Sequence, residues 1–243
     1  MSTLIICMAG LNTRFHNVGF DIPKYLLPWK NNTIIYEILY QIKKKYTFSN
    51  YLLIANKRDR FFKKKLKKEI IKLGINSNSI HYIGDTNGQA HTAFIATKFV
   101  NNQFPIFIHN GDTILYNRDF KKIEINLKKA DSYVDCFVAK NQKYSYVKKK
   151  DNKVKSIREK IRISSFASSG LYCFKNCDLY QKYYNKFAKE FNKKEIYVSN
   201  IINLMIKDKL KVLTNQIKKN FKTTVLGTPE EYGLELTKFT LKK

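Results

Sequence analysis

The residues best suited to chemistry begin with a short segment that follows an apolar run near the N-terminus. It reads Met8-Ala9-Gly10-Leu11-Asn12-Thr13-Arg14, and Pro23-Lys24 comes shortly after it. A tight turn around Gly10 can direct successive backbone N–H groups at phosphate oxygens. Arg14 and Lys24 add two cations, which suits a triphosphate whose charge grows at the transferring phosphorus. The Walker A spacing is absent. The glycine turn with Arg14 alone, or Pro23-Lys24 alone, would be better explained as an ordinary strand-to-helix loop with surface cations.

A second segment, Asn110-Gly111-Asp112, directly follows the apolar residues 104–109. A carboxylate at the C-terminal end of a strand, beside a glycine, is well placed to hold Mg²⁺, which takes few protein ligands and the phosphates of a substrate. The same tripeptide is also common in turns. Alone, it is a weak indication of a metal site.

The elements that must position these segments alternate between strand and helix patterns. Strands are predicted at residues 4–8, 50–55, 80–83 and 105–109, with helices at 34–45, 59–73 and 89–99. This order is typical of a parallel sheet with right-handed crossovers. In such sheets ligands bind beyond the carboxyl ends of the strands, so we expect both segments at one edge of the sheet.

The pattern changes after residue 132. Short β-type runs are followed by helices at 177–191 and 198–207, a last strand pair at 211–213 and 221–226, and a C-terminal helix from Pro229. The sequence predicts a single α/β domain over residues 1–243, with a Rossmann-like mixed, mostly parallel central sheet flanked by helices. Residues from about 1 to 130 form the expected nucleotide-binding half, and residues from about 131 to 243 the expected acceptor-binding half.

The net charge of +27, from 46 Lys+Arg against 19 Asp+Glu, raises the alternative of a nucleic-acid-binding protein. Only six of the basic residues are arginine, although arginine is preferred for bidentate phosphate and base contacts. The abundant residue types are those of A/T-rich codons, and the lysine runs are spread along the chain. We therefore expect that the lysine runs form solvated faces and that the protein has no nucleic-acid partner. The positive electrostatic field of the protein would still attract phosphorylated substrates.

The sequence also argues against an intrinsically disordered protein and against a membrane-spanning helix. A hydrophobic fraction of 44% is ample for a packed core, and no run of about 18 uncharged apolar residues could span a membrane. Residues 1–8 fit a strand rather than a signal peptide. The four cysteines have no framework spacing, which predicts reduced thiols and a cytoplasmic location.

Further segments complete a resemblance that covers the chain from Leu4 to about Tyr232. They are Gly88-Gln89-Ala90, Glu159-Lys160 at the end of residues 154–160, Ser169-Gly170 at the start of an apolar strand, and residues 226–232, which read LGTPEEY. With the first two segments, in this order, they resemble the nucleotidylyltransferase family that makes nucleoside-diphosphate sugars from an NTP and a sugar 1-phosphate.

The resemblance implies a role for each segment. Arg14 would clamp the triphosphate, and Lys24 would bridge the attacking phosphate and the α-phosphate. Gln89 would hydrogen-bond the base, and Asp112 would bind Mg²⁺. The remaining implied contacts are Met8, Ala9, Gly10, Leu11, Asn12, Thr13, Gly88 and Gly111 for the nucleotide, and Glu159, Lys160, Ser169 and Gly170 for the acceptor. Members of this family attack in line and need no protein nucleophile, which agrees with phosphoryl-transfer chemistry.

Three departures from the family pattern stand out. Asn12 replaces a frequent glycine, and asparagine tolerates the left-handed backbone better than most residues. Val225 stands where many members have a second metal-binding Asp, so the metal would rely on Asp112, phosphates and water, or on an unrecognised carboxylate. Asn200 stands where an Asp is frequent. These departures favour a divergent branch.

We expect a Mg²⁺-dependent nucleotidyltransferase that activates a phosphorylated sugar or polyol for a surface (capsular) polysaccharide. CTP is favoured, because Gln89 offers both a donor and an acceptor to a pyrimidine edge and the short chain resembles cytidylyl- and thymidylyl-transferring members. The use of dTTP or UTP stays open, as does a catalytically silent nucleotide-binding subunit. The sequence does not decide between a monomer and a homo-oligomer.

Overall fold

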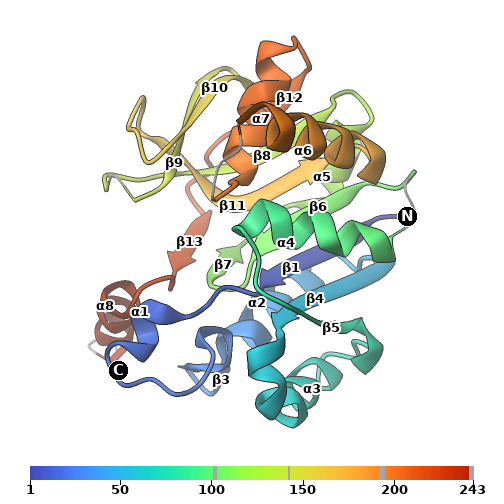
Figure 1. The fold of residues 1–243 in the computed structure, drawn as a ribbon. Coiled ribbons are helices and arrows are strands. Elements are labelled where there is room, and N and C mark those ends of the chain that lie inside the picture. The colour runs from blue at the N-terminus through green and yellow to red at the C-terminus, as the bar shows by residue number, and fades with distance from the viewer. Residues whose placement is uncertain (101–102, 142, 192–194, 241–243) are drawn as a thin grey trace.

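The central sheet draws strands from both halves of the chain. The computed structural model describes residues 1–100, 103–141, 143–191 and 195–240. Nine strands form one sheet in the order β5-β4-β1-β6-β11-β8-β12-β10-β9 (Figure 1). Their bounds are Thr3–Met8 (β1), Asn50–Asn56 (β4), Ile80–Ile83 (β5), Ile106–Asn110 (β6), Ser132–Val138 (β8), Ser145–Lys150 (β9), Lys153–Glu159 (β10), Phe166–Phe174 (β11) and Val212–Thr214 (β12).

The first half of the sheet is parallel throughout. β1 pairs in parallel with β4 and β6, and β4 with β5, which confirms the predicted strand–helix alternation. The side chains of β1 are buried on both faces of the sheet, because successive residues of a strand point to opposite sides. Leu4 and Ile6 belong to one apolar cluster and Ile5 to another. The apolar run therefore builds the middle of two hydrophobic layers.

Helices cover both layers. The helical bounds are Thr13–His16 (α1), Ile34–Lys43 (α2), Lys63–Ile71 (α3), Gln89–Ala96 (α4), Phe120–Leu127 (α5), Cys177–Phe191 (α6), Val198–Lys207 (α7) and Pro229–Thr240 (α8). Apolar residues of α2, α3 and α5 pack into one cluster, and those of α4, α6 and α7 into the other. Figure 1 shows α4, α6 and α7 on one face of the sheet. The predicted helices at 177–191 and 198–207 are confirmed.

The second half joins the same sheet through β11, which pairs antiparallel with both β6 and β8. Most pairings in this half are antiparallel, with β12 and β8 as the parallel exception. The mixed α/β fold with one central sheet flanked by helices is therefore confirmed. The assignment of a nucleotide half and an acceptor half stays a prediction.

The predicted pairing of residues 211–213 with 221–226 is wrong. β12 inserts between β8 and β10, whereas Lys222–Val225 (β13) pairs with Thr113–Tyr116 (β7) in a separate two-stranded sheet. β7 begins directly after Asp112 and offers β13 a free edge. The Leu226 N–H donates to the Asp112 carbonyl at 2.8 Å. This small sheet therefore holds the segment that follows β13 beside Asp112.

Other local differences have simple causes. The predicted helix at 59–73 starts later, because Lys57–Phe62 forms a 3₁₀ helix that is capped by Asn56, whose Oδ1 accepts a hydrogen bond from the Arg58 N–H. Pro28–Trp29 (β2) and Asn32–Thr33 (β3) form a short hairpin that the sequence patterns did not indicate, and neither β7 nor α5 was predicted. Within the described ranges, no helix has the length and apolar character needed to cross a membrane. All four cysteines are free thiols.

Candidate active site

A cavity of about 430 Å³ lies where the loop after β1 meets the start of α4 and the loop after β6. We call it the glycine-loop cavity. The predicted nucleotide-binding residues that line it are Met8, Ala9, Gly10, Leu11, Gly88, Gln89 and Gly111. The structure thus brings together three segments that lie far apart in the sequence. Asn12 and Thr13, also predicted here, do not line the cavity.

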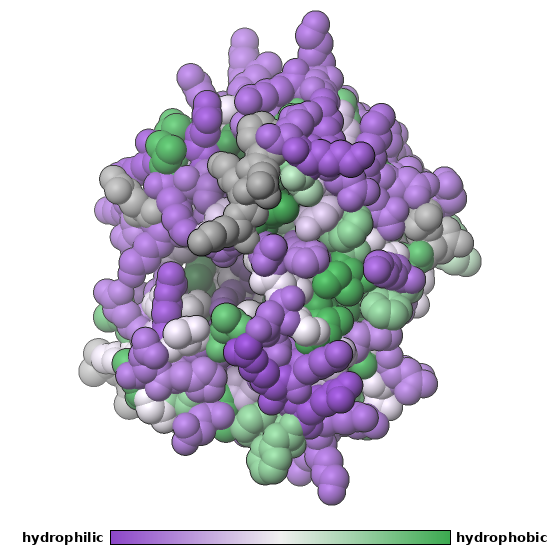
Figure 2. Space-filling view, viewed as in Figure 1, coloured by the Kyte–Doolittle hydropathy of each residue, from purple (hydrophilic) through white to green (hydrophobic). Residues whose placement is uncertain are grey.

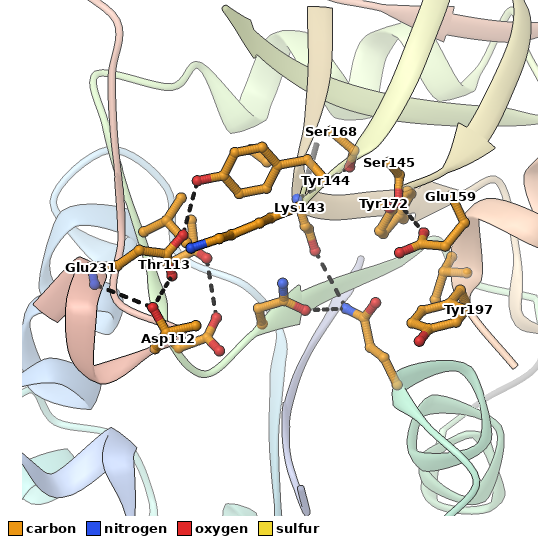
Figure 3. A pocket seen from close by; sticks show the side chains of 18 of the residues that line it. Asp112, Thr113, Lys143, Tyr144, Ser145, Glu159, Ser168, Tyr172, Tyr197 and Glu231 are labelled. Carbon is orange, nitrogen blue, oxygen red and sulfur yellow. Dashed lines mark hydrogen bonds between the residues drawn. The ribbon is translucent and has the colours of Figure 1, made fainter. Parts of the chain in front are cut away.

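A second cavity of about 290 Å³ lies beside β11, and we call it the β11 cavity. Arg14, Glu159, Ser169 and Gly170 line it. Figure 2 shows a hollow on the face where Figure 1 places β7, β11 and β13. Figure 3 shows side chains from both halves of the chain pointing into the β11 cavity. Arg14 therefore borders this cavity rather than the one formed by its own glycine-rich turn.

The two cavities meet at an ion pair. Lys24 and Asp112 line both of them, and the Lys24 ammonium contacts Asp112 Oδ2. The two side chains are 28% and 14% exposed, so both remain reachable from solvent. The junction therefore holds the Lys24 ammonium, which has three donors, and the Asp112 carboxylate, which has several acceptor sites.

The electrostatics of Asp112 favour its ionised form. Burial alone would raise the pKa of this carboxyl, but the Lys24 charge and hydrogen bonds from Lys24 and Thr113 outweigh that effect. The pKa of Asp112 consequently lies below its ordinary value of 3.8. Thr113 Oγ1 donates to Asp112 Oδ1 at 3.1 Å. Asp112 is thus a held carboxylate at neutral pH, with the charge that a cation requires.

The glycine-rich turn is braced by Asn12. Asn12 is the N-cap residue before α1, and its backbone is left-handed (φ 59°, ψ 17°), a conformation that asparagine tolerates. Asn12 Nδ2 donates to the Ile22 carbonyl at 3.2 Å. This hydrogen bond ties the turn to the segment that carries Pro23 and Lys24.

Gln89 stands between the cavities and lines both. Its Nε2 donates to Asn110 Oδ1 at 2.5 Å and lies 3.5 Å from the Gly170 carbonyl. The side chain predicted to contact the base is therefore held by a side chain from the end of β6. The contact between Gln89 and the base stays a prediction.

Three of the four predicted acceptor residues line the β11 cavity, namely Glu159, Ser169 and Gly170. Glu159 accepts hydrogen bonds from Ser145 and, at 2.7 Å, from Ser199. Lys160 has a left-handed backbone (φ 55°) and directs its ammonium to Tyr197 Oη at 2.9 Å. Lys160 does not line the cavity, whereas Tyr197 does. Lys160 therefore contacts the lining of the β11 cavity through Tyr197.

Comparison with known proteins identifies the family. The sequence pattern described as "Nucleotidyl transferase" matches residues 3–232. The chain belongs to the nucleotidyl transferase family. No curated protein sequence matches this nucleotidyl transferase significantly.

Solved structures agree with this membership. A nucleoside-diphosphate-sugar pyrophosphorylase from Vibrio cholerae RC9 is 26% identical, with a TM-score of 0.82 over 96% of this chain and 99% of the other. A putative glucose-1-phosphate thymidylyltransferase from Bacillus anthracis (19% identity, TM-score 0.79, 96% and 93% coverage) shares the fold. So does an inositol-1-phosphate CTP transferase from T. maritima (13%, 0.73, 95% and 90%).

Several residues of the nucleotidyl transferase site escaped the sequence interpretation, among them Tyr144 and Glu231. Tyr144 and Glu231 line the β11 cavity, and Tyr144 Oη donates to Glu231 Oε1 at 3.0 Å (Figure 3). Glu231 belongs to residues 226–232, which carry part of the family resemblance, so it could have been selected with that segment. Thr228-x-x-Glu231 is also a capping pattern, which predicts the start of a helix. Nothing in the sequence around Tyr144 indicates that it faces the site.

Proposed function

We propose that this nucleotidyl transferase moves a nucleotidyl group from an NTP, with CTP favoured, to a phosphorylated sugar or polyol. Pyrophosphate is released, and the product is an activated precursor for surface (capsular) polysaccharide. The meeting of the two cavities at Lys24 and Asp112 carries this proposal. It supports a donor in the glycine-loop cavity and an acceptor in the β11 cavity, with their phosphates at the shared boundary.

The reaction follows from this placement. An oxygen of the acceptor phosphate attacks the α-phosphorus, the bond from that phosphorus to the bridging oxygen breaks, and pyrophosphate leaves with the electron pair. Lys24 offers an ammonium to the phosphates of both substrates, and Arg14 adds charge from the side of the β11 cavity. No protein nucleophile is needed, because positioning and charge neutralisation supply most of the catalysis of phosphoryl transfer.

Asp112 is suited to hold Mg²⁺. Its ionised carboxylate stands at the junction of the cavities, and magnesium binds oxygen ligands, keeps several waters and accepts one or two carboxylates plus substrate phosphates. Among the described residues, no three His, Cys, Asp or Glu side chains gather to form a metal centre. Bound there, magnesium would neutralise charge on the phosphates.

The preference for CTP rests on Gln89 at the start of α4. Its amide carries donors and an acceptor and lines the glycine-loop cavity. Uracil and thymine also present both kinds of group, so dTTP and UTP remain the alternative donors. The Bacillus anthracis neighbour, titled a thymidylyltransferase, supports testing dTTP beside CTP.

A polyhydroxylated acceptor suits the lining of the β11 cavity. Hydroxyl groups of Ser145, Ser168, Tyr172 and Tyr197 surround it together with the carboxylate of Glu159. Such groups can exchange hydrogen bonds with several sugar or polyol hydroxyls. The proposal therefore assigns the acceptor's carbon skeleton to this side and its phosphate to the Lys24 side.

Pyrophosphate release tests the proposal. The full chain is incubated with Mg²⁺, one of CTP, dTTP, UTP, GTP or ATP, and a panel of sugar 1-phosphates and polyol phosphates, and products are identified by mass spectrometry. We expect release that requires both substrates and is fastest with CTP. Nucleotide binding without release for any pair would instead support a silent nucleotide-binding subunit, the reading that Val225 and Asn200 motivate.

A further inference from the structure

Position 225 brings no carboxylate to the metal site. Val225 ends β13 opposite Thr113, the neighbour of Asp112, and lines the β11 cavity. A valine there cannot bind a cation. Because magnesium at a phosphate site is commonly held by one or two carboxylates, the question is whether another carboxylate faces Asp112.

Glu231 faces Asp112 from the other side of Gly227. A Cβ built at Gly227 would lie 3.2 Å from Asp112 Oδ2 and 3.5 Å from Glu231 Oε2. One small space therefore separates an oxygen of each carboxylate, and it is open only because residue 227 has no side chain. Figure 3 shows Asp112 and Glu231 on the same side of the β11 cavity.

The carboxylate of Glu231 is held by neutral donors. Tyr144 Oη donates to Oε1 at 3.0 Å, and Thr228 Oγ1 donates to Oε2 at 3.2 Å. The nearby ammonium of Lys143 pairs with Glu230 at 2.7 Å instead. Among the described residues, no Lys or Arg forms a salt bridge with Glu231. An ionised carboxylate has about four acceptor sites, so this one retains room for a cation.

Helix capping explains only part of this arrangement. The Glu231 N–H donates to Thr228 Oγ1 at 3.2 Å, as in a capping box at the start of α8. Capping favours a Glu or Gln at this position but does not require it to face another carboxylate. Two facing carboxylates repel each other, and Lys24 contacts only Asp112 of the two. A divalent cation would compensate both.

We propose that Glu231 is the second carboxylate of the metal site and fulfils the role that Val225 cannot. This inference rests on the proposed function, because it assumes a metal-assisted transfer at Asp112. Asp112, directly before β7, and Glu231 of α8 would hold the ion, with substrate phosphates and water as its other ligands. With a cation on Asp112, the Lys24 ammonium would be available to the substrate phosphates.

Manganese binding to the full chain tests the proposal without relying on activity. Mn²⁺ alone is titrated and followed by water-proton relaxation. Glu231→Gln keeps the capping ability of the residue and removes its charge. We expect it to weaken Mn²⁺ binding at least about 10-fold, as Asp112→Asn also should. Glu230→Gln is the matched control, since it removes the neighbouring, exposed carboxylate and should change binding less than about 2-fold.

A rescue variant guards against a merely structural effect. Val225→Asp combined with Glu231→Gln returns a carboxylate to the same cavity, and we expect it to recover most of the lost Mn²⁺ affinity. Urea unfolding of each variant checks that the fold is intact. Unchanged Mn²⁺ binding in Glu231→Gln, with weakened binding in Asp112→Asn, would overturn the role of Glu231 and leave the proposed function standing. Normal metal behaviour in a protein that releases no pyrophosphate would overturn the proposed function alone.

Discussion

Replacing Lys24 by methionine tests the ion pair at the junction of the two cavities. Methionine keeps most of the apolar stem but removes the charge that faces Asp112. Breaking a fully buried pair costs about 3–5 kcal/mol because the remaining charge has no partner. Lys24 is 28% exposed and Asp112 14%, so water screens part of this cost. We therefore expect a loss of about 1–2 kcal/mol in the free energy of unfolding at pH 7.

The pH dependence of this loss has a definite sign. The pKa of Asp112 is lowered in the folded chain, so its ionised form stabilises the fold above the unfolded pKa of about 3.9. That contribution disappears as the pH falls through the lower folded pKa. The destabilisation caused by Lys24→Met, measured by urea unfolding, should therefore be complete at pH 6–7 and diminish below about pH 4.

A double-mutant cycle with Asp112→Asn separates stability from catalysis. In the Asp112→Asn background, Lys24→Met should cost little stability, which gives a coupling of about 1–2 kcal/mol. Turnover should nevertheless fall about 10²–10³-fold in Lys24→Met and stay low in the double variant, because a charge near the transferring phosphate is lost. Lys238→Met, at an exposed pair with Glu235, is the control. Zero coupling, or turnover of Lys24→Met within about 10-fold of the unaltered chain, would refute this reasoning.

Three further predictions concern the walls of the site and the core. Glu159→Gln should raise KM for the acceptor about 10-fold or more while KM for CTP stays nearly constant; a rise confined to CTP would contradict the acceptor assignment. Gly170→Ala should lower the free energy of unfolding in urea by about 1–3 kcal/mol more than Gly19→Ala does. Both glycines have φ near 85°, but of the two only Gly170 would place a Cβ within 2.2 Å of another side chain. Equal losses for the two variants would mean that backbone strain alone matters. Arg118→Met should cost about 3–5 kcal/mol in urea unfolding, because the Arg118–Asp135 pair is almost fully buried; a loss under about 1 kcal/mol would contradict that account.

The elements that local pattern determines could be predicted from the sequence. Residues 80–83, 177–191 and 198–207 match β5, α6 and α7 in both bounds, since their apolar spacing suits a strand or a helix within one window. β7 was missed because it is short and stable only beside β13, which lies far along the chain. Pairing over such a separation leaves no local signal.

The candidate site shows the same division. Met8–Leu11 and Asp112 could be selected because they lie at the C-terminal ends of predicted strands, where ligands bind in such sheets, whereas Gly88 was selected from the family resemblance. The position of Arg14 in the β11 cavity depends on how α1 packs, and Phe15 of this helix contacts Tyr232 of α8 with ring centroids 6.2 Å apart. Tyr144 and Glu231 meet because the residue before β9 lies against α8. Tertiary contacts of this kind cannot be inferred from residue spacing.

A crystal structure with CTP and Mg²⁺, without acceptor, tests the central claim most directly. The account predicts cytosine and ribose in the glycine-loop cavity beside Gln89, and the α-phosphate next to Lys24 and Asp112. The β11 cavity should stay open for the acceptor. CTP bound in the β11 cavity, or a triphosphate remote from Lys24, would contradict the division of the site into a donor side and an acceptor side.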